Sequence, residues 1–242
     1  MKWALICGAS GDIGQQIAVD LAAEGWSLYL HYHRATAKIM TLVEKLTQAH
    51  PKQDFIMFKQ DMTDQGSAEQ IASQIFTSLD VVIFAQGTTE YGLFRDLSPT
   101  KFDQMLAMQL QTPLRLIALL EDKLVQSEAG RIVFIGSVYG GNGSALEVGY
   151  STLKGALSAF CSAYSKEVAS TGLTVNVIAP GAVKTQMNMT FSAEEKAEVA
   201  ETIPKGRFAV PKEISYFVKS LLPKEAGYLT GQTLYVTGGW LR

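Results

Sequence analysis

The segment Trp-Ala-Leu-Ile-Cys-Gly-Ala-Ser-Gly-Asp-Ile-Gly, residues 3–14, passes from five apolar residues into a turn with three glycines. An apolar run that ends in such a turn is typical of a buried strand, and helical spacing begins at Gly14. Glycines allow the backbone amides of the turn to approach a pyrophosphate at the start of a helix. The spacing is not Gly-x-Gly-x-x-Gly, and a tight strand-to-helix turn needs glycine for steric reasons alone. A dinucleotide site is therefore one of two explanations for this turn.

Apolar runs and helical segments alternate along the rest of the chain. The other apolar runs are residues 28–32, 55–58, 81–85, 132–135, 174–178 and 233–236. Helical spacing covers residues 14–23, 35–50, 67–77, 100–126, 150–170 and 211–221. Right-handed crossovers place each such helix on a parallel sheet. We therefore expect an α/β protein with a Rossmann-type, doubly wound parallel sheet of about seven strands and helices on both faces.

The 242 residues show no linker, so we expect a single domain over residues 1–242. One long polar stretch, residues 185–206, interrupts the alternation, and we interpret it as a substrate lid with a short helix near residues 193–200.

Composition excludes several classes of function. Charged residues make up 18% of the chain, hydrophobic residues 47%, and the formal net charge is −2. No basic cluster of the kind that binds nucleic acid is present, and no stretch approaches the ~20 apolar residues of a membrane helix. The first apolar run begins too close to Met1 for a signal peptide, and Cys7 and Cys161 lie in apolar runs, as buried reduced thiols do. We expect a cytoplasmic protein that binds neither nucleic acid nor a membrane.

Tyr150 and Lys154 lie four residues apart in a helical segment, which places both side chains on one face. An ordinary tyrosine has a pKa of about 10, but a nearby ammonium and a cationic nicotinamide favour the phenolate. Tyr150 is then the general acid of a carbonyl reduction, and Lys154 holds the nicotinamide ribose. Ser137, after the fifth strand, donates to the carbonyl oxygen. The alternative is that Tyr150 is a core aromatic residue and Ser137 a turn cap.

The loop after the second strand bears on the choice of cofactor. Tyr32, His33 and Arg34 stand where an NAD-binding protein has an acidic residue for the ribose 2′-hydroxyl. Arg34 instead pairs with a 2′-phosphate, which favours NADP(H) over NAD(H), unless His33 and Arg34 are only a solvated loop. Asp61, after the third strand, accepts a hydrogen bond from the adenine amino group or closes a turn.

With these residues in place, the chain resembles the short-chain dehydrogenase/reductase family over its whole length, and most closely its 3-oxoacyl-carrier-protein reductase branch. The matching motifs are residues 8–14, Asp61, Gly87, residues 130–133 leading to Ser137, the pair Tyr150 and Lys154, residues 176–181 with Thr185, and residues 229–232 with 238–239. The resemblance implies hydride transfer from NADP(H) to a small or carrier-bound ketone by a homotetramer or dimer, without a metal site. It implies cofactor contacts from Gly8, Ser10, Gly11, Asp12, Ile13, Gly14, His33, Arg34, Asp61, Met62, Ala85, Gly87, Tyr150, Lys154, Pro180, Gly181, Val183 and Thr185.

The sequence departs from the family pattern in four places. Cys7 and Asp12 replace the usual Thr and Gly, and an Arg that commonly binds the 2′-phosphate is missing. Residues 84–87, Phe-Ala-Gln-Gly, replace Asn-Asn-Ala-Gly. Gln109 stands where an Asn usually completes the catalytic tetrad through a helix bulge and a water. Glu128 and Thr171 replace two Arg residues that dock acyl carrier protein, which disfavours that substrate.

Residues 87–93 and 144–150 resemble a bacterial subgroup described as elongation factor P 5-aminopentanone reductases, whose ketone is carried on a modified lysine. Glu147 then pairs with a cationic amine of the substrate, or is an exposed loop acid. Two further hypotheses are a nicotinamide-nucleotide sensor or scaffold without turnover, suggested by Gln109 and residues 84–87, and a protein in which the motifs are unrelated turns.

Overall fold

The computed structural model describes residues 2–188 and 192–241, and these residues form one seven-stranded sheet. The strands are β1 (Lys2–Cys7), β2 (Trp26–Tyr32), β3 (Phe55–Lys59), β4 (Val81–Phe84), β5 (Arg131–Ile135), β6 (Thr174–Pro180) and β7 (Thr233–Val236). They are all parallel, in the order β3-β2-β1-β4-β5-β6-β7. Strands β2 and β3 are added on one side of β1 and strands β4 to β7 on the other, so the expected doubly wound sheet is confirmed.

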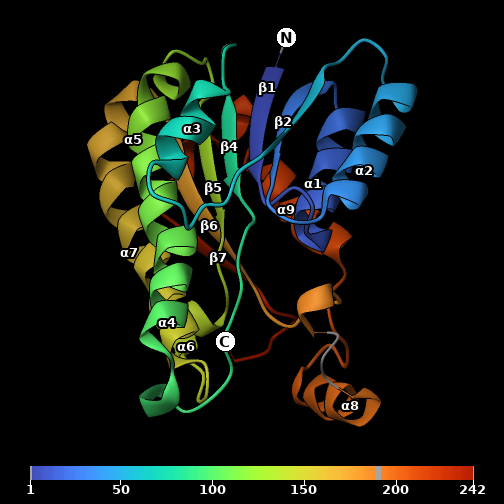
Figure 1. Ribbon diagram of the computed structural model, residues 1–242, viewed down its shortest axis with the longest axis vertical. Coiled ribbons are helices and arrows are strands. Elements are labelled where there is room, and N and C mark those ends of the chain that lie inside the picture. The colour runs from blue at the N-terminus through green and yellow to red at the C-terminus, as the bar shows by residue number, and fades with distance from the viewer. Residues whose placement is uncertain (1, 189–191, 242) are drawn as a thin grey trace.

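Helices cover both faces of this sheet (Figure 1). The α-helices are α1 (Asp12–Ala23), α2 (Thr36–Ala49), α3 (Ser67–Ser73), α4 (Pro99–Leu106), α5 (Thr112–Val125), α6 (Tyr139–Asn142), α7 (Val148–Val168), α8 (Ala193–Thr202) and α9 (Pro211–Ser220). Helices α1, α2 and α9 contribute to the core on one face, and α3, α5 and α7 to the core on the other. Short 3-10 helices are Phe94–Asp96, Ala169–Thr171, Gln186–Asn188 and Lys224–Tyr228.

Continuous apolar strands are the physical basis of this arrangement, since a central strand of a doubly wound sheet is buried on both faces. Residues 4–7 of β1 and 81–83 of β4 have no exposed surface. In contrast, all four residues of the edge strand β7 are only half-buried. The apolar runs therefore predicted the central strands well.

One long predicted helix, residues 100–126, is divided in the structure. Helix α4 ends at Leu106, a π-helical turn follows at Ala107–Gln111, and α5 begins at Thr112. Pro113 has no N–H group with which to bond the carbonyl of Gln109, four residues earlier, so the regular helical pattern cannot continue there. The resulting bulge changes the direction in which Gln109 points.

Within the predicted lid, residues 185–206, the structure describes 185–188 and 192–206. The expected helix is α8, which begins at a capping box formed by Ser192 and Glu195. Helix α8 lies at the same end of the molecule as α4 and α6, where the strands have their carboxyl ends (Figure 1). Residues 189–191 of the predicted lid lie outside the described residues.

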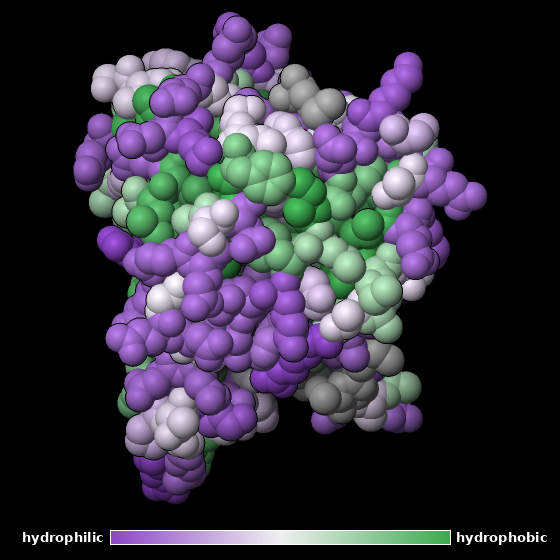
Figure 2. All heavy atoms as spheres, turned by 45° about the horizontal axis from the view of Figure 1, so that its top comes forward, coloured by the Kyte–Doolittle hydropathy of each residue, from purple (hydrophilic) through white to green (hydrophobic). Residues whose placement is uncertain are grey.

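On the face displayed in Figure 2, hydrophobic residues form a band between two hydrophilic areas. In the part of the chain that the structure describes, no helix is both long and apolar enough to span a membrane.

Candidate functional site

Ser137, Tyr150 and Lys154 come together at the carboxyl end of β5. Ser137 lies two residues after the end of β5, and Tyr150 and Lys154 lie in the first two turns of α7. The Ser137 hydroxyl lies close enough to the Tyr150 hydroxyl to lower the pKa of that phenol. The Lys154 ammonium donates to the carbonyl of Ile135 at 2.9 Å and lies 5.5 Å from the centre of the Tyr150 ring. The structure thus brings together three groups that the sequence places up to 17 residues apart.

Burial dominates the electrostatics of this group. Tyr150 is 9% exposed and Lys154 is 4% exposed. Burial raises the pKa of Tyr150 to about 12, although the Ser137 hydroxyl acts in the opposite direction. Burial lowers the pKa of Lys154 to about 8. The largest influence on the Tyr150 pKa in this structure is burial, which disfavours the phenolate, so Tyr150 holds its proton at neutral pH.

Gln109 completes this arrangement from the π-helical turn. Its side-chain NH2 group donates to the carbonyl of Thr88 at 2.9 Å, and its buried Oε1 accepts no hydrogen bond from any described residue. A Cβ atom placed on Gly87 would lie 3.3 Å from this Oε1 and 3.5 Å from Lys154 Nζ. Gln109 and Lys154 thus converge beside Gly87, where a side chain would press on the end of the Gln109 amide. The amide oxygen of Gln109 therefore lies near the Lys154 ammonium, and a catalytic role for Gln109 stays a prediction.

The glycine turn lies at the carboxyl end of β1. Gly8 has a φ of +80°, and a Cβ there would approach Gln86 N to 2.7 Å. A Cβ on Gly14 would meet the carbonyl oxygen of Gly8 at 2.3 Å, so two of the three glycines are sterically required. The N-cap of α1 is Gly11, and no described side chain caps this helix. The first backbone amides of α1 and the helix dipole fit a pyrophosphate. Ser10, Asp12 and Ile13 lie at this end of the helix.

His31, which lies within an apolar run of the sequence, supports this turn. Its Nδ1 accepts a hydrogen bond from the Gly8 amide at 3.2 Å, so its Nε2 carries the proton and donates to the Gln60 carbonyl at 2.9 Å. The side chain is 2% exposed, and burial lowers its pKa to about 4, which keeps the ring neutral. In the sequence, the supporting role of His31 is indicated only by its being a polar residue within an apolar run, since a buried polar group needs hydrogen-bond partners.

Three of the predicted cofactor residues meet at the ends of β2 and β3. His33 Nε2 lies 3.1 Å from an Asp61 carboxylate oxygen, and Arg34 is exposed beside them. Asp61 also accepts from the Thr63 amide at 2.9 Å, so it closes a turn, as one of our two interpretations held. Burial raises the pKa of Asp61, but the bonds from Thr63 and the charges of His33 and Arg34 outweigh it and hold that pKa below its usual value. The Met62 side chain lies in the core, which leaves only its backbone for a ligand.

The remaining predicted cofactor residues follow β4 and β6. Ala85 N donates to the Cys7 carbonyl at 2.9 Å, which places it beside the glycine turn. Pro180 accepts from the Val138 amide at 2.8 Å, which brings residues 180–181 next to Ser137. Val183 is buried and pairs with Ala209 in an isolated bridge. Thr185 lies at the base of the predicted lid.

An acidic group lies at the rim of the Tyr150 site. Glu147 is half-buried and accepts a hydrogen bond from the Thr89 hydroxyl at 2.8 Å. The amide of Gly92 donates to the Leu146 carbonyl at 2.8 Å, and Leu146 has a φ of +65°. Residues 87–93 and 144–150, the two segments of the narrower resemblance, are therefore in contact. Glu147 raises the pKa of Tyr150 as a secondary cause after burial.

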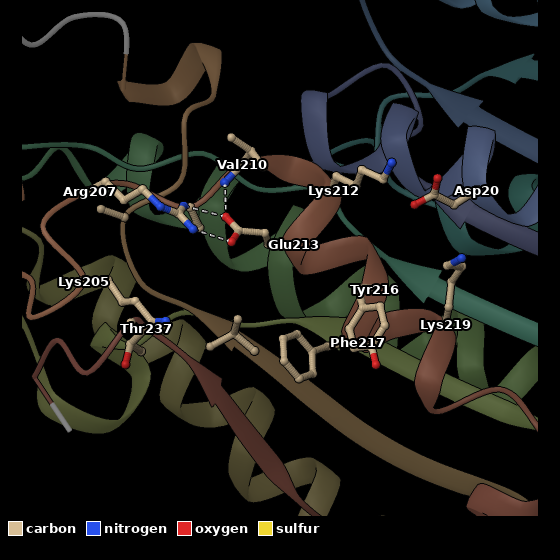
Figure 3. A pocket seen from close by; sticks show the side chains of 14 residues that line it. Asp20, Lys205, Arg207, Val210, Lys212, Glu213, Tyr216, Phe217, Lys219 and Thr237 are labelled. Atoms are coloured by element: carbon tan, nitrogen blue, oxygen red, sulfur yellow. Dashed lines mark hydrogen bonds and ion pairs between the residues drawn. The ribbon is translucent and has the colours of Figure 1, made fainter.

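Two cavities lie close to parts of this site. One of about 560 Å³ lies between α9 and the carboxyl ends of β6 and β7 (Figure 3). Figure 3 shows Tyr216 and Phe217 of α9 beside it, and the ion pair between Arg207 and Glu213 at 2.7 Å. None of the predicted catalytic or cofactor-binding residues lines this cavity. Ala182, the residue before Val183, does line it. A second cavity, of about 680 Å³, is bordered by Asp12, Thr185, α8 and Phe208, so it joins the glycine turn to the predicted lid.

No group of three or more metal-ligating side chains occurs among the residues that the structure describes.

Comparisons with known proteins agree with this geometry. The family model "short chain dehydrogenase" matches residues 2–196. An oxidoreductase of Bacillus subtilis (strain 168), "Uncharacterized oxidoreductase YmfI", is 38% identical over 239 residues, covering 99% of this chain and 98% of the relative. The 3-oxoacyl-[acyl-carrier-protein] reductase FabG of Escherichia coli (strain K12) is 31% identical over 246 residues, covering 98% and 96%.

A solved structure of YwfH, described as an NADPH-dependent reductase involved in bacilysin biosynthesis, matches with a TM-score of 0.92 and 25% identity, covering 100% of this chain and 98% of that one. The fold, the order of the motifs and these relatives lead to one conclusion. This chain belongs to the short-chain dehydrogenase family, as an NAD(P)H-dependent oxidoreductase that interconverts a CH–OH group and a carbonyl.

Proposed function

We propose that this protein is an NADP(H)-dependent ketone reductase of the 3-oxoacyl-carrier-protein reductase type, with Ser137, Tyr150 and Lys154 as its catalytic residues. The observation that carries this proposal is the convergence of the three side chains, with the Ser137 hydroxyl near the phenol of Tyr150 and the ammonium of Lys154 beside the Tyr150 ring. An inert nucleotide sensor would not need a buried lysine and a buried phenol in contact, because both are costly to bury.

A reduced nicotinamide, when bound, supplies the hydride that reaches the carbonyl carbon. Tyr150 is protonated and donates its proton to the carbonyl oxygen, while the Ser137 hydroxyl donates a hydrogen bond to the same oxygen. Lys154 stabilises the phenolate that this transfer leaves on Tyr150 and holds the ribose hydroxyls. Gln109 anchors this arrangement through Thr88, and its Oε1 lies on the Lys154 side, where it aids return of the proton.

The cofactor contacts proposed here are those of the glycine turn, Gly8, Ser10, Gly11, Asp12, Ile13 and Gly14, with His33, Arg34, Asp61, Met62, Ala85, Gly87, Pro180, Gly181, Val183 and Thr185. The exposed Arg34 favours NADP(H), since a guanidinium pairs well with a 2′-phosphate. The description of YwfH as NADPH-dependent supports the same choice. His33 already pairs with Asp61, which leaves Arg34 as the principal candidate for the phosphate.

A second candidate substrate is a ketone that carries a cationic amine, as in the aminopentanone reductases. The observation that favours it is Glu147, held by Thr89 at 2.8 Å on the rim of the Tyr150 site. Glu128 and Thr171 are both exposed and offer no positive charge to an acidic carrier protein. The charge of the substrate therefore separates the two candidates.

We further propose that the protein works in the cytoplasm as a homotetramer or dimer, and that residues 185–206 cover the bound substrate. The two free, buried cysteines suit a reducing compartment. Exposed aromatic residues on α9 and near β7, such as Tyr216 (63% exposed) and Tyr228, support association through that side of the sheet.

The test is oxidation of NADPH and NADH by the purified protein with an acetoacetyl thioester, an amino-ketone and a simple diketone. The Tyr150→Phe variant keeps the ring but lacks the proton donor, so it should retain NADPH binding and lose at least a hundredfold in kcat, in line with general-acid catalysis. Turnover by the variant at the rate of the natural protein would refute the mechanism. A higher kcat/KM for the amino-ketone, abolished in Glu147→Gln, would select the second candidate.

A further inference from the structure

Asp12 occupies an unusual position, because its backbone and its side chain face two different parts of the site. It is the first residue of α1, so its amide belongs to the turn proposed to bind phosphate. Its carboxylate Oδ2 accepts a hydrogen bond from the backbone amide of Gln186 at 2.6 Å, across 174 residues of sequence. Gln186 follows Thr185 and begins the 3-10 helix at the base of residues 185–206.

A second contact supports the same point of attachment. Lys38 Nζ, from α2, donates to the Gln186 side-chain oxygen at 2.9 Å. The base of the segment is therefore held from both α1 and α2, and Asp12, Thr185 and Gln186 border the same cavity of about 680 Å³.

A simpler explanation is that Asp12 only stabilises the helix dipole from the first turn of α1. That role requires no particular partner for the carboxylate. The observed bond is short and charge-assisted, a type roughly twice as strong as a neutral hydrogen bond, and it satisfies an amide at the start of a 3-10 helix.

We propose that Asp12 is a positioning residue that couples occupancy of the phosphate-binding turn to the placement of Gln186 and the 3-10 helix Gln186–Asn188. This inference rests on the proposed dinucleotide site. A phosphate at the first amides of α1 repels the Asp12 carboxylate, which disfavours rotation of that side chain toward the turn and favours its bond with Gln186. Cofactor binding then stabilises the contact between Asp12 and the 3-10 helix that begins at Gln186.

Limited proteolysis with trypsin tests this coupling, because Lys196, Lys205 and Arg207 are cleavage sites within or just after the segment. We expect saturating NADPH to slow cleavage there in the natural protein by about fivefold, because the cofactor strengthens one exposed charge-assisted hydrogen bond, that between Asp12 and Gln186. The Asp12→Ala variant should lose this protection, and Asp12→Asn, which keeps an acceptor, should retain part of it. Asp12→Ala should also raise KM for NADPH more than it lowers kcat.

Gln186 provides the matched variants. Gln186→Pro removes the amide donor at a helix start that tolerates proline, whereas Gln186→Ala keeps that donor and removes only the Lys38 contact. The double variant Asp12→Ala/Gln186→Pro should be no more sensitive to trypsin than either single variant, because both remove one bond. Additive effects, or full protection in Asp12→Ala, would overturn the proposal.

Fluorescence titration with NADPH separates this result from the proposed function. If the natural protein does not bind NADPH, the dinucleotide site and the coupling both fail. If it binds NADPH and Asp12→Ala is protected as well as the natural protein, only the coupling fails. Thermal unfolding of each variant shows whether it is folded before these comparisons are made.

Discussion

Replacement of Lys154 by methionine should stabilise the folded protein at neutral pH while abolishing turnover. Lys154 is 4% exposed, and burial lowers its pKa from 10.5 to about 8. At pH 7 the folded protein therefore carries an ammonium group where a neutral side chain would be favoured. Methionine has a similar shape and no charge, so it removes this penalty together with the hydrogen bond to Ile135.

The sign and size of the effect follow from linkage. The pKa in the folded state lies below that in the unfolded chain, so between pH 8 and 10.5 the unfolded chain binds more protons, and the stability of the natural protein rises with pH. Each pKa unit corresponds to about 1.4 kcal/mol, which gives a penalty of about 3 kcal/mol below pH 8. Loss of the bond to the Ile135 carbonyl offsets about 1–2 kcal/mol of the gain at every pH.

Urea unfolding of both proteins at pH values from 6 to 10.5 measures this difference. The free energy of unfolding of Lys154→Met, relative to the natural protein, should fall by about 3 kcal/mol over that range, because only the natural protein gains stability from deprotonation of Lys154. Lys166→Met is the matched control, since Lys166 is exposed on the same helix and its variant should show no such trend. A difference that stays constant with pH would refute the conclusion that burial lowers the pKa of Lys154.

Three further outcomes are expected. His31→Asn keeps an acceptor near the Gly8 amide, whereas His31→Gln places its amide nearer the Gln60 carbonyl; NADPH affinity by fluorescence titration should fall less in the Asn variant, and the reverse order would contradict a role in holding the turn. Arg34→Ala should raise KM for NADPH about tenfold and leave KM for NADH unchanged; an equal effect on both would place the 2′-phosphate elsewhere. Arg131→Met should lower the free energy of unfolding by about 3–5 kcal/mol in urea, because the buried guanidinium donates to three backbone carbonyls; a change below 1 kcal/mol would contradict this.

The fold was predictable because its main determinants are local. Seven apolar runs that alternate with helical segments were sufficient to predict a doubly wound parallel sheet, since crossover handedness leaves few alternatives. The grouping of Tyr150 with Lys154 was equally local, through helical spacing. The placement of Ser137 beside them depended on its position after a central strand, where active-site groups of doubly wound sheets commonly lie.

Other features of the site depend on contacts that no short segment of sequence contains. The bulge at Gln109 follows from Pro113, a signal that was present and that our helix prediction for residues 100–126 did not use. The support of Gly8 by His31 requires the register of β1 and β2, and the raised pKa of Tyr150 depends on the depth of its burial. The contact between Asp12 and Gln186 joins residues 174 positions apart.

The site also explains why polar groups are buried here at a cost to stability. Lys154 is an ammonium within the protein interior at neutral pH, and the buried side-chain oxygens of Gln86 and Gln109 accept no hydrogen bond from the described residues. Each such group lowers stability by about 1–3 kcal/mol relative to a satisfied or apolar replacement. Gln86 donates to the carbonyl of Met108 in the π-helical turn, and Gln109 from that turn converges with Lys154 beside Gly87. Because selection for stability alone would replace them, their presence together at this point is better explained by catalysis.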